Sequence, residues 1–252
     1  MENEKKFYIT RLIPNMLTMS ALCMGLFAIR MAIIENYQFA VICIAIACFL
    51  DTIDGRVARK LNVSSDIGAQ LDSLADFLNF GISPGFIMYF WAMDDYDKII
   101  GVGWIPVLVL AVCMAIRLAR FNVDLTDKDP NNPLNKYFFK GVPAPMAALF
   151  VLTPLIISFE FNNLYFVQNP LFVIINTIIS ALLAASTIPT PCVKKVKISI
   201  AYKYIILLLF ACLFILSLFR PWMTFIVIYI GYIFGIFWGW KYYFQFKKEL
   251  KK

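Results

Sequence analysis

The stretch DTIDGRVARKLNVSSDIGAQLDSLAD, residues 51–76, places four aspartates at helical spacing in a chain that is 61% hydrophobic and only 15% charged. Asp51 and Asp54 share one face of a helix, and Asp72 and Asp76 share one face of a second helix. A short polar link between the two pairs is long enough to turn the chain back. We therefore expect two antiparallel helices that present two carboxylates each to a common cavity.

Four carboxylates in an apolar setting repel one another, and each is costly unless it is neutralised. A hard divalent cation is the simplest way to neutralise them, because it prefers oxygen ligands. The alternative interpretation, helix caps and solvated loop residues, accounts for Asp66, which we expect to cap the second helix. It does not account for four aspartates on two helical faces, so the stretch predicts a metal site.

As a motif, the stretch is D-x-x-D-G-x-x-A-R-x(8)-G-x-x-x-D-x-x-x-D, with every fixed position filled. The fixed positions are Asp51, Asp54, Gly55, Ala58, Arg59, Gly68, Asp72 and Asp76. This motif resembles the signature of the CDP-alcohol phosphatidyltransferases, and its length makes the match specific. The resemblance implies an enzyme that transfers a phosphatidyl group from a CDP-activated lipid to an alcohol and releases CMP.

The resemblance also implies roles for the four aspartates. Asp51, Asp54, Asp72 and Asp76 would bind a divalent metal, Mg2+ or Mn2+, with two ions expected, and Asp76 would also act as the general base. Displacement at phosphorus needs neutralisation of the diphosphate charge and a base for the incoming hydroxyl. A site of this kind supplies both.

A second set of residues is expected to bind the donor, CDP-diacylglycerol: Pro14, Asn15, Gly55, Ala58, Arg59, Ser65 and Gly68. Gly55 and Ala58 would let the nucleotide lie against the helix backbone, although close packing between helices is an alternative explanation for them. Arg59 and Ser65 suit contacts with the diphosphate by charge and by hydroxyl group. The donor-binding role of Pro14 and Asn15 is what their counterparts in the family imply. A plain helix start is the alternative explanation for this pair.

Two further stretches bear on the acceptor alcohol: RLARFN, residues 117–122, and FKGVPAP, residues 139–145. Both resemble the bacterial phosphatidylserine synthase branch of the family, which implies L-serine as the acceptor. Arg117 or Arg120 could bind the serine carboxylate bidentately, although positive charge at a helix end is an alternative role. Glycerol 3-phosphate or an inositol phosphate is the alternative acceptor, because RLAR together with Lys140 could supply several cations.

With 252 residues and a mean hydropathy of +0.75, the chain is too apolar for a soluble domain. We expect one integral membrane domain over residues 1–252, all-α and polytopic, with about eight transmembrane helices. The expected spans are residues 16–34, 37–60, 66–90, 101–121, 143–160, 170–188, 199–219 and 222–240. The resemblance implies a six-helix core plus two C-terminal helices. Pro14 is expected to open the first span after a surface-lying segment, 1–13, and the acidic residues 94–97 to form a loop.

The distribution of basic residues predicts the orientation in the membrane. Of 23 Lys and Arg residues, we place only Arg30, Lys98 and Arg220 at the face opposite the aspartate-bearing link. Both termini and the active site are therefore expected on the cytoplasmic side of a bacterial inner membrane, and no cleavable signal peptide is expected. This topology and attraction to anionic membrane lipid explain the net charge of +7, so no nucleic-acid partner is implied.

Several classes of protein are excluded or disfavoured. The chain has no histidine, which excludes His-based nucleophilic catalysis, including phospholipase D-like chemistry. Its 6 cysteines have no C-x-x-C spacing, so they predict neither disulfides nor a zinc site. A transporter that uses the aspartates as a cation path is disfavoured, because neither half of the chain repeats the other.

The last expected span carries a strip of small residues, because Gly231, Gly235 and Gly239 recur every four residues. Such a strip lets membrane helices approach one another closely. Its partner is expected to be either another helix of the same chain or a second copy in a homodimer, as in members of the family.

Overall fold

The computed structural model describes residues 2–61, 63, 65–126, 138–161, 163–191 and 200–249. The first half of the chain forms helices α1 (Glu2–Ile33), α2 (Tyr37–Leu61), α3 (Asp66–Asp76), α4 (Ser83–Met88), α5 (Asp94–Ile100) and α6 (Ile105–Thr126), with π-helices η1 (Phe77–Ile82) and η2 (Tyr89–Met93). The second half forms β1 (Phe138–Lys140), α8 (Ala144–Glu160), the 3-10 helix η3 (Tyr165–Gln168), α9 (Pro170–Ala185), β2 (Pro189–Pro191), α10 (Ile200–Phe219) and α11 (Pro221–Glu249).

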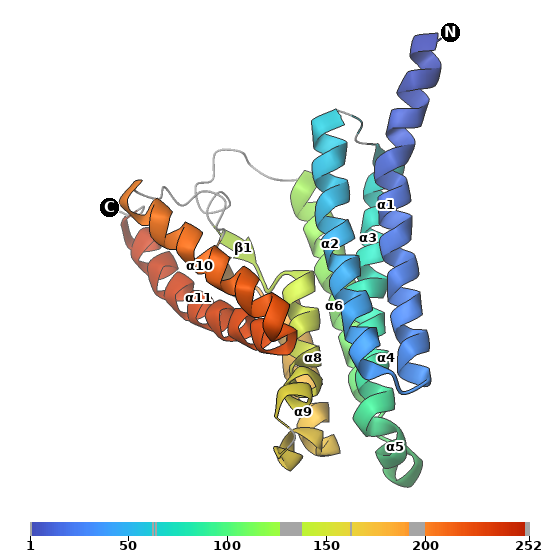
Figure 1. Ribbon diagram of the computed structural model, residues 1–252, viewed down its shortest axis with the longest axis vertical. Helices are drawn as coiled ribbons and strands as arrows, with labels where there is room; N and C mark the ends of the chain where they lie inside the picture. The colour runs from blue at the N-terminus through green and yellow to red at the C-terminus, as the bar shows by residue number, and fades with distance from the viewer. Residues whose placement is uncertain are drawn as a thin grey trace.

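The helices form a bundle with a tilted hairpin at one side (Figure 1). Helix α1 packs along α2 and also contacts α3, η1 and α4, while α6 packs against η1 and α9. Helices α10 and α11 run obliquely beside the bundle, and α11 contacts α8 and β2. In Figure 1, the end of α2 and the start of α3 lie between α1 on one side and α6 on the other.

The length and apolarity of the helices confirm an all-α polytopic membrane protein. Three helices are long and apolar enough to cross a membrane, namely Leu12–Ile33, Ile105–Val123 and Pro221–Trp240. Shorter apolar helices cover Ala144–Glu160, Pro170–Ala185 and Tyr204–Phe219. Each of the eight expected spans corresponds to a helical segment of the described chain, with α10 and α11 set apart from the other six. Many large apolar side chains point outward along these helices, as expected for a surface in contact with lipid.

The expected starts of two helices in the N-terminal half of the chain are wrong. Helix α1 runs without a break through Pro14, so this proline does not open the first helix. A proline removes only one intrahelical hydrogen bond, and packing along α2 keeps the helix intact. The location of residues 1–13 at the membrane surface stays a prediction. Ser65, and not Asp66, caps α3, because its Oγ accepts a hydrogen bond from the Gly68 backbone N–H at 3.1 Å.

The acidic residues 94–97 were expected in a loop but form the first turn of α5. This polar segment is helical because it continues the helix of η2 without a break. The helix ends at Gly101, whose φ of 72° lies in the left-handed region. The Asp97 carboxylate then accepts hydrogen bonds from the backbone N–H groups of Gly103, at 2.7 Å, and Trp104, at 3.3 Å.

The all-α expectation needs one small addition, because β1 and β2 pair antiparallel with Lys140 opposite Pro189. Gly141 follows β1 with a φ of 77°, and an added Cβ there would lie 2.6 Å from the Ser186 carbonyl oxygen. This close approach ties the FKGVPAP stretch to the end of α9. The two short strands thus connect the segment before α8 with the segment after α9.

The third expected span is continuous helix from α3 to α5, and its glycines permit close packing on α6. An added Cβ at Gly81 would lie 2.9 Å from Met114 Cγ, and one at Gly85 would lie 3.1 Å from Val107 Cγ1. The first distance is too short for a Cβ atom and the second is tighter than most Cβ contacts, so the glycines allow the two helical segments to approach closely.

A polar contact at the other end of this interface also fixes how α3 and α6 are aligned. The Asn122 side-chain amide donates a hydrogen bond to Ser73 Oγ at 3.1 Å. Asp76 lies between Ser73 and Gly81 on one segment, and Arg117 lies between Met114 and Asn122 on the other. The antiparallel register therefore places the RLARFN stretch alongside the second half of the aspartate motif.

The glycine strip on α11 does not pack within the chain over most of its length. Added Cβ atoms at Gly231 and Gly235 would meet no heavy atom of the described chain within 4 Å, whereas Gly239 is buried. Packing of the strip against another helix of the same chain is therefore wrong for Gly231 and Gly235.

Gly81→Val should destabilise the fold, because the new side chain would overlap Met114 at the interface with α6. We expect a loss of about 1–3 kcal/mol, measured as a lower melting temperature in detergent. Leu108→Val, at an exposed position of α6, is the control and should leave the melting temperature unchanged. Equal melting temperatures for the two variants would contradict the close contact between η1 and α6.

Candidate active site

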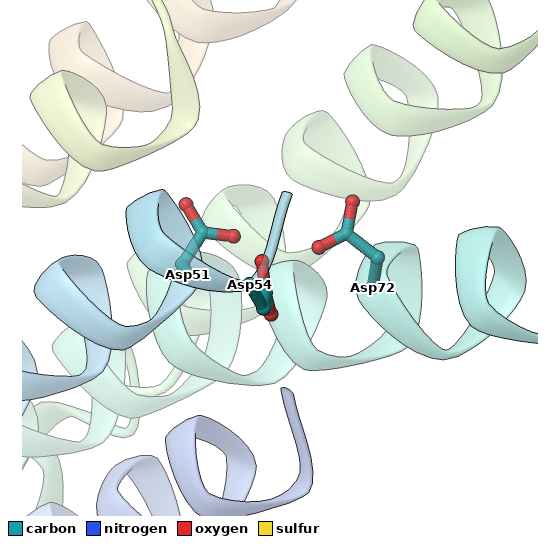
Figure 2. Close-up of side chains that lie close together, drawn as sticks. All are labelled: Asp51, Asp54 and Asp72. Carbon is teal, nitrogen blue, oxygen red and sulfur yellow. The ribbon is translucent and has the colours of Figure 1, made fainter. Parts of the chain in front are cut away.

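Three of the four expected carboxylates converge between α2 and α3. Asp51 and Asp54 on α2 and Asp72 on α3 each offer an oxygen, and these oxygens all lie within 4.8 Å of one another. In Figure 2, Asp51 and Asp72 extend toward each other from their two helices, with Asp54 between them. This arrangement arises because the aspartates lie at helical spacing and because α3 runs antiparallel to α2.

Asp54 is held from a third helix. The Thr18 hydroxyl on α1 donates a hydrogen bond to Asp54 Oδ2 at 2.6 Å, and the Asp54 residue is only 4% exposed. This bond fixes the direction of the carboxylate and neutralises no charge. The sequence interpretation missed Thr18, whose one available signal was its position one helical turn after Pro14.

Asp76 lies one turn further along the helix than Asp72 and completes the set. Its carboxylate lies beside that of Asp51, and its Oδ1 is buried without a hydrogen-bond partner in the described part of the chain. A buried carboxylate oxygen without a partner is costly unless a cation or a proton compensates for it. Asp76 is not one of the three residues whose oxygens lie mutually within 4.8 Å, so it flanks the cluster.

The site fits a divalent cation by its donor chemistry. Every donor is a carboxylate oxygen, which suits Mg2+, Mn2+ or Ca2+ rather than the softer transition metals. Three such oxygens lie close enough together to share one ion, and the unpaired Asp76 oxygen lies next to them. The aspartate cluster can therefore bind a divalent metal.

A cavity of about 160 Å³ opens beside the cluster, between α1, α2 and α3. Its wall contains all seven residues expected to bind the donor, Pro14, Asn15, Gly55, Ala58, Arg59, Ser65 and Gly68. Asp54 and Asp72 also line it, together with Thr18, Val63 and Ala69, which the sequence interpretation missed. The structure therefore brings the expected donor residues together around one space that adjoins the carboxylates.

The two glycines of the cavity have different structural roles. The three atoms nearest an added Cβ at Gly55 all belong to the Arg59 side chain of the same helix, the nearest at 3.5 Å. Gly55 therefore faces the cavity and is not pressed against another helix. At Gly68, an added Cβ would lie 3.0 Å from Asn15 Oδ1, so this glycine lets α3 approach α1.

The two arginines of the RLARFN stretch face different partners. The Arg117 Nε donates a hydrogen bond to the Val142 carbonyl at 2.7 Å, and its guanidinium interacts electrostatically with Asp76. Arg120 instead donates to the Ser186 carbonyl at 3.5 Å. Neither residue lines the cavity, and of the two only Arg117 interacts electrostatically with one of the four aspartates, Asp76.

The fold and the site define an integral membrane protein whose helices hold a carboxylate cluster suited to a divalent cation. The chain belongs to the CDP-alcohol phosphatidyltransferase family, whose model matches residues 11–176. It is 32% identical over 223 residues to a CDP-diacylglycerol–serine O-phosphatidyltransferase of Mycobacterium tuberculosis, covering 88% of this chain and 76% of that protein.

Relatives of the same name occur in other bacteria. The chain is 33% identical over 206 residues to the Helicobacter pylori protein, covering 81% of this chain and 82% of that one. It is 34% identical over 183 residues to the Bacillus subtilis protein, covering 73% of this chain and 92% of that one.

Asp72→Asn should lower the rate of CMP release at least about a hundredfold, because it removes a charged ligand from the cluster. Asp66→Asn is the matched control, since Asp66 is exposed in the first turn of the same helix and lies outside the cluster. CMP release from purified protein, measured at saturating donor, tests both variants. Losses of similar size at the two positions would contradict the assignment of the cluster.

Proposed function

We propose that the protein transfers the phosphatidyl group of CDP-diacylglycerol to the hydroxyl of L-serine, giving phosphatidylserine and CMP. The observation that carries this proposal is the register that places the RLARFN stretch beside the aspartate motif, in which Arg117 interacts electrostatically with Asp76. A single guanidinium beside the reaction centre suits an acceptor with one carboxylate. The names of the three bacterial relatives support the same acceptor.

The donor would lie in the cavity between α1, α2 and α3. Gly55 and Ala58 leave room for the nucleotide along α2, and Arg59 and Ser65 are placed to contact the diphosphate. The four aspartates would hold two Mg2+ or Mn2+ ions, whose charge would stabilise the diphosphate during the displacement. Thr18 keeps Asp54 directed toward that position.

The acceptor would approach from the side of α6. Arg117 would hold the serine carboxylate. Asp76 would take the proton of the serine hydroxyl while the hydroxyl oxygen attacks the lipid-bearing phosphorus. A new bond forms between this oxygen and phosphorus, and the bond from phosphorus to the CMP oxygen breaks. The serine carboxylate also pairs with the cationic guanidinium, so the positive charge of Arg117 favours serine over a simple alcohol.

Glycerol 3-phosphate and inositol phosphate remain the alternative acceptors. A phosphate group calls for several converging cations, but Arg120 donates to the Ser186 carbonyl at the end of α9. The Lys140 side chain lies outside the described part of the structure. Among the described basic residues of the RLARFN stretch, Arg117 alone interacts electrostatically with one of the four aspartates, which favours serine.

The proposal includes the location and assembly of the protein. The end of α2 and the start of α3 lie toward the same end of the bundle as the start of α1 (Figure 1). The basic residues favour the cytoplasmic side of a bacterial inner membrane for this end. Membrane lipid would surround the apolar helices. Because Gly231 and Gly235 face no helix of the described chain, the strip on α11 could pack against a second copy in a homodimer.

Purified protein supplied with CDP-diacylglycerol and each candidate acceptor should form phosphatidylserine with serine, with one CMP released per lipid product. Mass spectrometry of the lipid and assay of CMP measure the two products. A chelator should abolish the reaction, and added Mg2+ or Mn2+ should restore it. Asp76→Asn is the inactive control. The proposal would be contradicted if lipid product formed with glycerol 3-phosphate or inositol phosphate but not with serine.

A further inference from the structure

The backbone of Gly141 joins two segments that are far apart in the chain. Its N–H donates a hydrogen bond to the Ile188 carbonyl at 2.9 Å, next to the pair that Lys140 of β1 forms with Pro189 of β2. An added Cβ at Gly141 would lie 2.6 Å from the Ser186 carbonyl oxygen. The segment after β1 is therefore in direct backbone contact with the segment that follows α9.

Two features make glycine the residue that fits this position. The φ of 77° lies in the left-handed region, which residues with a side chain rarely adopt. The atom that an added Cβ would meet belongs to the backbone, so it cannot rotate away as the end of a flexible side chain can. A side chain at Gly141 would therefore shift the chain that leads from β1 to α8.

The residue after Gly141 holds an arginine of the site. The Val142 carbonyl accepts a hydrogen bond from Arg117 Nε at 2.7 Å. Val142 is buried in the same cluster as Met114 and Leu118, which precede and follow Arg117 on α6. The position of this carbonyl is therefore set by the turn at Gly141 and by packing on α6.

We propose that Gly141 is a positioning residue for the acceptor, whose left-handed turn presents the Val142 carbonyl to Arg117 and so orients the guanidinium for the serine carboxylate. This inference rests on the proposed function, in which Arg117 binds that carboxylate.

The hydrogen bond at Nε leaves the outer edge of the guanidinium for the acceptor. The N–H groups of a guanidinium point in fixed directions within one plane. With Nε bonded to Val142, the Nη1 and Nη2 groups form an edge that can bind a carboxylate through two parallel hydrogen bonds. A shift of the Val142 carbonyl would turn this plane, and the acceptor would lose its alignment with the attacked phosphorus.

The inference assigns a role to residues outside the family match, which ends at residue 176. Ser186 and Ile188 lie beyond that limit, and their backbone carbonyls adjoin Gly141. Gly141, Val142, Ser186 and Ile188 are not among the residues that line the donor cavity. A change at Gly141 should therefore act on the acceptor and not on the donor.

Gly101 offers a matched control with the same backbone conformation. Its φ of 72° is also left-handed, but an added Cβ there would meet no heavy atom of the described chain within 4 Å. It ends α5, at the opposite end of the bundle from the start of α3 (Figure 1). Alanine at position 101 introduces backbone strain alone, whereas alanine at position 141 adds the overlap with the Ser186 carbonyl.

Gly141→Ala should raise the KM for serine about tenfold, the effect of losing a hydrogen bond to a charged group. The KM for CDP-diacylglycerol should stay unchanged. Gly101→Ala should lower the melting temperature and alter neither KM. In an Arg117→Lys background, Gly141→Ala should raise the KM for serine no further, because lysine has no guanidinium plane to orient.

Pro189→Gly is a second variant, which decides the question where Gly141→Ala does not fold. It loosens the backbone next to the Ile188 carbonyl, which accepts the hydrogen bond from Gly141. We expect it to raise the KM for serine as well, again without a change in the KM for CDP-diacylglycerol.

An unchanged KM for serine in the folded variants at positions 141 and 189 would overturn the inference, as would equal increases for serine and the donor. Additive effects of Gly141→Ala and Arg117→Lys would also overturn it, because Gly141 would then act independently of Arg117. If the wild-type protein does not turn over serine, the proposed function fails and the inference fails with it. Serine turnover by the wild type with unaffected variants would overturn the inference alone.

Discussion

The site depends on how the negative charge of carboxylates inside an apolar helical bundle is neutralised. Asp51, Asp54 and Asp72 present oxygens within 4.8 Å of one another, and the buried Oδ1 of Asp76 adjoins them without a hydrogen-bond partner among the described residues. The hydrogen bond from Thr18 orients one carboxylate but leaves all the negative charge in place. A divalent cation bound there would neutralise this charge, and the same cation would suit the diphosphate of the proposed donor.

Close helix packing surrounds the cluster on two sides, which the proposed function assigns to the donor and to the acceptor. Gly68 lets α3 approach α1, where the cavity forms, and Gly81 lets η1 approach α6, where Arg117 interacts electrostatically with Asp76. Chemistry at the phosphorus requires donor, acceptor and base to meet in one geometry. The close approaches at the two glycines bring α1, α3 and α6 together around the carboxylates, which is the arrangement that the proposed reaction needs.

Much of the site could be predicted from the sequence, because its parts lie at local helical spacing. The aspartate spacing predicted the facing helices α2 and α3, and the family motif selected residues that line one cavity. Helix boundaries were less predictable, since packing along α2 carries α1 through Pro14 against its local preference. The sequence offered little sign of Thr18 beyond its position one turn after Pro14, because its contact with Asp54 joins segments far apart in the chain.

The central claim is that the carboxylates between α2 and α3 bind divalent metal. Anomalous X-ray diffraction from crystals soaked in Mn2+ measures the metal position directly. The account predicts anomalous peaks within coordination distance of Asp51, Asp54 and Asp72, with Asp76 at the edge of the same density. Peaks confined to other acidic residues, such as those at the start of α5, would contradict it.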